Sequence, residues 1–128
     1  MQRKQTGSGT VWESSVGYSR AVRVGDLIEV SGTTAIENDE VVAVGQPAEQ
    51  TRHIFKKIES ALVQLGASMS DVIRTRMYVI DISHWEEIGK VHGEFFSNVK
   101  PASTMVEVSK LIRPELLVEI EITAWAGD

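Results

Sequence analysis

The sequence predicts an α+β fold, in which one mixed β-sheet carries two helices packed on one face. Two segments, 48–65 and 84–96, have apolar residues at helical spacing, and β-rich runs lie before, between and after them. Helices separated by strands in the order β-β-(β)-α-β-α-β-β are typical of this class. The 128 residues suffice for one core but not two, so we expect a single domain over residues 1–128.

The N-terminal part predicts a hairpin preceded by a loose lead-in or an edge strand over residues 1–10. Residues 20–24 and 27–31 are β-rich, and Gly25-Asp26 between them suits a two-residue turn. Gly32 then marks the strand end or a close approach of backbone. We expect the turn-rich region 37–45 to be a loop with a short strand over 41–44.

The first helix is predicted from Pro47 to Leu65. Pro47 is suited to the first turn of a helix, and Gly66 is suited to a C-terminal cap. Its expected buried stripe consists of Ile54, Phe55, Ile58, Ala61, Leu62 and Leu65. The second helix is expected to open at Ser83 or His84, with Trp85, Ile88, Val91, His92, Phe95 and Phe96 along one face.

Three further strands are predicted, over residues 72–80, 101–108 and 116–125. In the first, we expect Ile73, Thr75, Met77 and Val79 on one face and Arg74, Arg76 and Tyr78 on the other. In the last, an apolar face should meet the helices, formed by Leu116, Val118, Ile120, Ile122 and Ala124. The opposite face carries two carboxylates together with Leu117 and Trp125, so a subunit interface is expected to cover part of it.

Composition narrows the classes of partner and cofactor. The net charge of −5 and the scattered basic residues argue against nucleic acid as a ligand. The absence of cysteine excludes disulfides and thiolate chemistry, and the three histidines do not form a metal-ligand pattern. No signal-like or membrane-spanning apolar run is seen, so we expect a cytoplasmic protein without membrane association, metal or cofactor.

Eight short sequence pieces are spread from about Val16 to Ala124. They are Gly17-Tyr18-Ser19-Arg20-Ala21-Val22, Val30-Ser31-Gly32, Leu65-Gly66-Ala67, Asp71-Val72, Tyr78-Val79-Ile80-Asp81, Phe95-Phe96, Pro101-Ala102 and Val118-Glu119-Ile120-Glu121. No single piece is specific, but in this order they resemble the Rid (YjgF/YER057c/UK114) family. The resemblance implies a homotrimer of chorismate-mutase-like architecture, with the sheets inside, the helices outside and ligand clefts between subunits.

The resemblance also implies site residues. Deaminase members of the family hydrolyse enamines and imines with no metal or organic cofactor. By position, Tyr18 and the backbone of Ser31 and Gly32 line the pocket, and Glu119 positions the attacking water. The arginine that pairs with the substrate carboxylate falls at Ser103, and a nearby cysteine falls at Met105.

Replacing that arginine by Ser103 changes the expected chemistry. A guanidinium binds a carboxylate through two charge-assisted hydrogen bonds, whereas a hydroxyl offers one neutral bond of about 1 kcal/mol. The change would also leave Glu119 without its counter-charge, so hydrolysis of 2-imino acids should be weak or absent. Arg76 is the foremost candidate for a replacement cation; its alternative role is a salt bridge with Glu119 or Glu121. The other candidates are Arg20, Arg23, Arg74 and His92.

Two functional hypotheses follow. In the first, the chain is a hydrolase of an imine, an enamine or a related small carbonyl compound, with Glu119 orienting water. In the second, the same cleft binds a small metabolite without catalysis. Each site residue also has a plain structural alternative: a solvated or paired Glu119, a packing Tyr18 or a small strand residue at Ser103. Endoribonuclease activity, described for some family members, is disfavoured by the acidic balance of the chain. Chorismate mutase activity, found on the same trimeric architecture, is disfavoured because no cluster of cations that could bind a dicarboxylate is evident.

Overall fold

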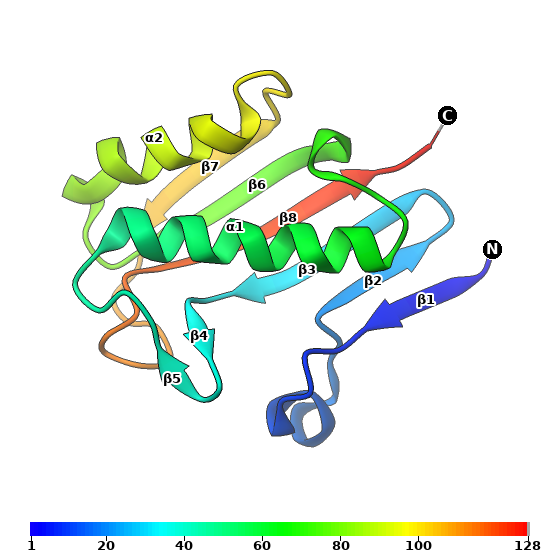
Figure 1. Cartoon of the computed structure of the whole chain (residues 1–128), viewed down its shortest axis with the longest axis horizontal. Helices are drawn as coiled ribbons and strands as arrows, with labels where there is room; N and C mark the ends of the chain where they lie inside the picture. Colours follow the sequence, from blue (N-terminus) through cyan, green and yellow to red (C-terminus); the bar gives the residue numbers. More distant parts are fainter. Residues whose placement is uncertain (128) are drawn as a thin grey trace.

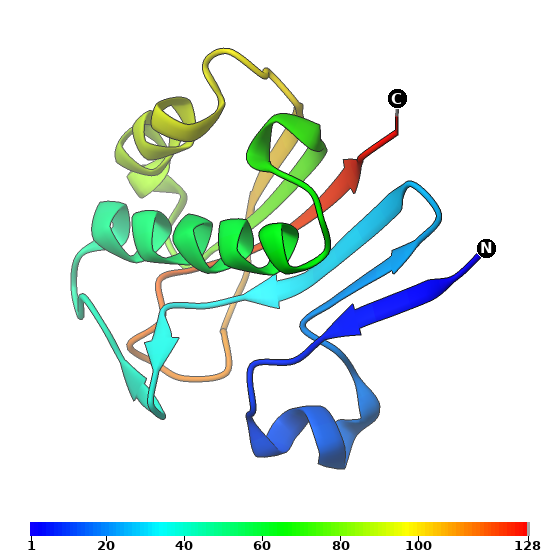
Figure 2. The ribbon, with the colours of Figure 1, turned by 45° about the vertical axis from the view of Figure 1, so that its right-hand side comes forward.

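The computed structural model describes residues 1–127 and shows a two-layer α+β arrangement (Figure 1). One layer is a six-stranded sheet with the order β1-β2-β3-β8-β6-β7. The other layer consists of helices α1 and α2, which lie on the same face of the sheet (Figure 2). The predicted fold class is therefore confirmed.

The strands of the large sheet and the two helices account for most of the chain. The strands are β1 (Arg3–Thr6), β2 (Ala21–Val24), β3 (Leu27–Thr33), β6 (Val72–Val79), β7 (Ala102–Glu107) and β8 (Val118–Trp125). The helices are α1 (Pro47–Gln64) and α2 (Trp85–Phe96). Neighbouring strands are antiparallel except β6 and β7, which are parallel because α2 forms the crossover between them.

The hairpin and the first helix form where the sequence predicts them. The β2–β3 turn places Gly25 at φ +60°, a conformation that glycine adopts without strain. Helix α1 begins at Pro47, and Gly66 follows its end at φ +78°. The amide of Ala67 donates to the carbonyl of Leu62, which closes the C-terminus with a hydrogen bond typical of a glycine cap.

The prediction for region 37–45 was wrong in its detail. A two-stranded ribbon forms instead, from β4 (Ile36–Glu37) and β5 (Glu40–Val41). Asn38 and Asp39 make the turn at φ 51° and 67°, because their short polar side chains tolerate the left-handed conformation. Of the expected strand 41–44, only Val41 pairs, and Ala43 has φ 54°.

The predicted side-chain direction of Ile73 was also wrong. Ile73 is 50% exposed, whereas Val72 and Thr75 are buried. The cause is a bulge in β6, where Val72 pairs with Ala124 but Arg74 already pairs with Thr123. One extra residue in β6 reverses the alternation at this point, and the expected pattern holds from Arg74 onward.

The core lies between α1, α2 and the inner face of the sheet. Strand β8 supplies its central row, since Val118, Ile120, Ile122 and Ala124 are all at most 1% exposed. Alternate residues of β8 lie on the opposite face, which neither α1 nor α2 covers (Figure 2). We call this uncovered side the open face of the sheet.

A buried glutamine ties α1 to the chain that enters β8. The Gln50 side chain is fully buried; its Nε2 donates to the Glu115 carbonyl at 3.0 Å, and its Oε1 accepts from the Leu117 amide at 2.9 Å.

We expect Gln50→Leu to lower the free energy of unfolding by about 1–3 kcal/mol, because it leaves the Glu115 carbonyl and the Leu117 amide without these hydrogen-bond partners. Gln64→Leu, at the exposed end of α1, is the matched control, with a change within about 0.5 kcal/mol. Equal midpoints in chemical denaturation would contradict this role.

Candidate functional site

The glutamate predicted to orient water lies directly against the predicted glycine. A bulge in β3 separates the Val30–Ile122 pair from the Thr33–Ile120 pair, and Gly32 lies within it. A Cβ atom placed on Gly32 would come 2.2 Å from Oε2 of Glu119 and 3.4 Å from its Cγ. A side chain at residue 32 would therefore displace this carboxylate from its present position.

The same bulge holds the segment that carries Tyr18. The Ser31 amide donates to the Arg20 carbonyl at 3.0 Å, and the Ser31 hydroxyl donates to the Ser19 carbonyl at 2.7 Å. Ser31 thus serves the site through its position in the backbone, and its hydroxyl fixes the approach of Tyr18.

Arg20 is the cation that the structure places in this cluster. Its Nη2 donates to the Gly32 carbonyl at 2.7 Å, and its guanidinium carbon lies 5.9 Å from the centre of the Tyr18 ring. Its Nε is buried without a hydrogen-bond partner among the described residues. The positive charge of Arg20 lowers the pKa of Glu119, although the two side chains form no ion pair among the described residues.

Burial and charge act on Glu119 in opposite directions. Burial raises the pKa of its carboxyl most strongly, the positive charge of Arg20 lowers it, and the negative charge of Glu121 raises it again. The net shift is upward from the ordinary value of 4.5. A half-buried carboxylate with a raised pKa is suited to accept a proton near neutral pH.

Arg76 lies on the open face together with Tyr78, as the sequence predicts. It pairs in register with Glu121, and its Nη1 approaches Oγ1 of Thr123 at 3.4 Å. The Tyr78 hydroxyl donates to Oε1 of Glu121 at 2.5 Å, and this hydrogen bond is the main cause of the raised pKa of Tyr78. These groups extend the polar region beside Glu119 along β6 and β8.

Ser103 and Met105 lie on the other face of the sheet. Ser103 pairs with Thr75 across the parallel strands, and its Oγ accepts a hydrogen bond from the Thr75 hydroxyl at 2.7 Å. Met105 packs against the core. One copy of the chain therefore does not bring Ser103 and Glu119 together, although the sequence analysis placed them in one cleft.

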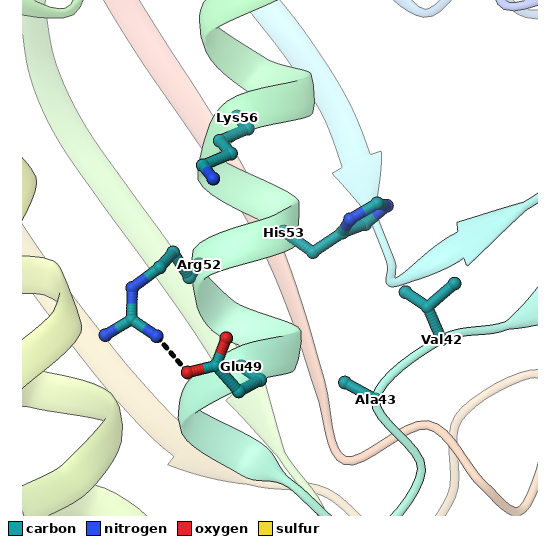
Figure 3. Close-up of a pocket in the computed structure, with 6 residues that line it drawn as sticks. All are labelled: Val42, Ala43, Glu49, Arg52, His53 and Lys56. Carbon is teal, nitrogen blue, oxygen red and sulfur yellow. Dashed lines mark hydrogen bonds and ion pairs between the residues drawn. The ribbon is translucent and has the colours of Figure 1, made fainter.

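The groove between α1 and the segment after β5 lies apart from these residues (Figure 3). Its volume is about 200 Å³, and it is lined by Val42, Ala43, Glu49, Arg52, His53 and Lys56. Arg52 is bound to Glu49 and to Glu94, and His53 lies 2.9 Å from Glu37. Arg52 and His53 are already engaged by carboxylates, and none of the predicted site residues lines this groove, so we assign it no role.

Residues 1–127 contain neither a metal-binding cluster nor a membrane-spanning helix. No group of three or more histidines and carboxylates is arranged to hold a metal ion. No helix in this part of the chain has the length and apolarity needed to cross a bilayer.

Comparison with known proteins gives a consistent result. The family model described as "Endoribonuclease L-PSP" matches residues 10–126. A crystal structure of a YjgF/YER057c/UK114 family member from Mycobacterium tuberculosis is 50% identical with a TM-score of 0.88, and the alignment covers 97% of this chain and 99% of that one. An uncharacterised Streptomyces coelicolor protein is 37% identical over 94% of this chain and 90% of its own length. The 3-aminoacrylate deaminase RutC of Acinetobacter baylyi is 34% identical over 84% and 85%, respectively.

The contact between Gly32 and Glu119 can be tested by a double-mutant cycle. We expect Gly32→Ala to lower the free energy of unfolding by about 1–3 kcal/mol, because the new methyl group displaces the carboxylate. In a Glu119→Ala background the same change should cost clearly less. Gly89→Ala is the control: a Cβ there meets nothing within 4 Å, so it should be neutral or stabilising. An equal cost of Gly32→Ala in both backgrounds would refute the contact.

The raised pKa of Glu119 predicts a pH-dependent effect of Glu119→Gln on stability. A carboxyl whose pKa is higher in the folded than in the unfolded state costs nothing while it is protonated in both. The cost appears as pH rises above 4.5 and is complete above the folded-state pKa. Glu119→Gln should therefore become progressively more stable, relative to the parent, between pH 4 and pH 7. Denaturation across this range checks the sign, and a gain confined to acidic pH would contradict it.

Proposed function

The chain belongs to the Rid (YjgF/YER057c/UK114) family, and on that premise we propose that it hydrolyses a small imine, enamine or related carbonyl compound at clefts between the subunits of a homotrimer. A relative named as a deaminase supports chemistry of this type at the level of the family. The specific substrate class and the roles of individual residues belong to the proposal.

One observation carries the proposal: a half-buried carboxylate with a raised pKa lies beside a glycine, an arginine and a tyrosine. Glu119 accepts a proton from water as the water oxygen bonds to the imine carbon, and the nitrogen gains a proton. The resulting carbinolamine then loses ammonia and leaves a carbonyl. The sum is R₂C=NH + H₂O → R₂C=O + NH₃, which requires no oxidant or reductant.

The composition of the open face supports assembly with further copies. Trp125 is 54% exposed and Leu27, its partner across the strands, is 41% exposed; they lie on the same face as Glu119, Glu121 and Arg76. A covered interface would remove the apolar groups from water and leave the charged ones around a cleft. Since Ser103 lies on the other face, a neighbouring copy is what would bring it to Glu119.

The proposed substrate is not the 2-imino acid of the archetypal reaction. At Ser103 a neutral hydroxyl stands where a guanidinium would neutralise the substrate carboxylate. Arg20 is already engaged with the Gly32 carbonyl, and Arg76 lies beside Thr123. The cleft, lined by Tyr18, Gly32, Arg76, Ser103 and Met105, is thus proposed to favour a substrate with less negative charge.

The same missing charge favours an alternative in which the cleft binds a small metabolite without turnover. A protein that binds but does not hydrolyse has no need of a basic Glu119, so mutation of this residue separates the two functions. Binding of RNA, which the name of the matching family model suggests, is disfavoured by the net charge of −5.

The decisive experiment measures ammonia released from short-lived imines that an amino-acid oxidase or an amine oxidase generates in situ. We expect acceleration over buffer, greater for neutral than for carboxylate-bearing imines, and a loss of about 10²–10⁴-fold in Glu119→Gln because general-base assistance is removed. Glu59→Gln, on the exposed side of α1, is the matched control and should retain full activity. No acceleration with any imine, while ligand binding persists, would favour the non-catalytic alternative.

A further inference from the structure

Ser103 is the outer end of a hydrogen-bond chain that begins in the core. His92 lies on α2, and its Nε2 is 2.9 Å from Oγ1 of Thr75 on β6. Thr75 in turn donates to Oγ of Ser103 on β7 at 2.7 Å. Thr75 is fully buried, whereas Ser103 lies exposed on a strand at the edge of the sheet. A half-buried imidazole is thus linked, through the buried Thr75, to a surface hydroxyl.

The geometry gives this chain a direction. A hydroxyl has one proton, and Thr75 donates its proton to Ser103. Oγ1 of Thr75 must therefore accept from His92, which requires the proton on Nε2 of the neutral ring. Ser103 accepts from Thr75, so its own proton is free to be donated outward. Successive hydrogen bonds polarise one another, and each donor strengthens the next.

His92 is held neutral by its surroundings. Its ring lies 5.8 Å from that of Phe55 and 4.8 Å from that of Phe96, and burial lowers its pKa. The neutral ring donates through Nε2, so the hydrogen-bond chain that ends at Ser103 contains no ionic charge. Helix α2 is already anchored by Ile88, Val91 and Phe96, so packing of the helix does not require a polar chain here.

We propose that Ser103 is a directed, uncharged hydrogen-bond donor for a neutral acceptor oxygen of the ligand, such as the carbonyl of an amide or ester, with Thr75 and His92 as positioning residues. The inference rests on the proposed function only in that Ser103 faces the same ligand as Glu119. It deepens that function by naming the substrate class: imines or enamines that carry an amide or ester carbonyl where the archetypal substrate carries a carboxylate.

The test uses stable probes, so it does not depend on turnover. Pyruvamide carries a neutral amide where pyruvate carries a carboxylate. Binding of each probe to the intact protein is measured by calorimetry or by NMR titration. We expect pyruvamide to bind about 5–10-fold more tightly, the effect of one directed hydrogen bond and of the missing cation. Tighter binding of pyruvate would overturn the proposal.

Two variants of Thr75 separate positioning from packing. Thr75→Val keeps the shape but breaks the chain, and we expect it to weaken pyruvamide binding by about fivefold or more while leaving pyruvate nearly unchanged. Thr75→Ser restores the hydroxyl and should restore pyruvamide affinity. Equal losses for both probes, or a failure of Thr75→Ser to rescue, would show a merely structural role and overturn the proposal. Thermal unfolding of both variants checks that they are folded.

The state of His92 gives an independent readout. We expect ¹⁵N NMR of the ring at neutral pH to show the neutral form protonated on Nε2; protonation on Nδ1 would reverse the chain and overturn the proposal. If pyruvamide binds in the predicted way but no imine is hydrolysed, the proposed hydrolase fails and the donor site stands. If imines are hydrolysed through Glu119 but Thr75→Val has no selective effect, the proposed hydrolase stands and the proposed donor role of Ser103 fails.

Discussion

The strict alternation of β8 is the constraint on which both the core and the site depend. Val118, Ile120, Ile122 and Ala124 bury one face of this central strand under the helices, so the intervening residues Glu119 and Glu121 must lie on the open face. A slip of one residue in its pairing with β3 or β6 would bury two carboxylates and expose the core row. The hydrophobic free energy of the core therefore also fixes the position of the acidic groups.

A bulge and a glycine convert that position into a specific environment. Pairing of β3 with β8 is interrupted between Val30 and Thr33. Within this interruption the Glu119 carboxylate lies against the backbone of Gly32, which has no side chain. The carboxylate is half-buried there, which would disfavour its charged form, and the guanidinium of Arg20 offsets part of that cost. Arg20 is in turn held by the carbonyl of the same glycine. The arrangement of Gly32, Glu119 and Arg20 is thus a local consequence of the bulge in β3.

The sequence predicts the elements whose physical cause is local. Helix α1, with Pro47 at its start and Gly66 after its end, the β2–β3 hairpin and the alternation of β8 all follow from periodicity and turn chemistry. The bulge at Ile73 was missed because an extra residue in one strand is defined only by its partner strand. Arg20 was weighed, but Arg76 was favoured, because strand alternation alone places Arg76 beside Tyr78. What brings Arg20 to Glu119 is the fold of the β3 bulge around residues 19–20.

The two ends of the proposed cleft differ in electrostatic character, and this difference follows from which face of the sheet each one occupies. The Glu119 end is charged, because the open face carries carboxylates and guanidinium groups that water or a neighbouring copy can reach. The Ser103 end is neutral, because Ser103 is connected through Thr75 to an imidazole whose pKa is lowered by burial. A ligand that spans both ends would be oriented by this contrast: its polar, uncharged group would lie at Ser103 and its reacting carbon near Glu119. Orientation of this kind does not require an arginine at residue 103. It follows from the contrast between the charged groups beside Glu119 on one face of the sheet and the neutral hydrogen-bond chain at Ser103 on the other.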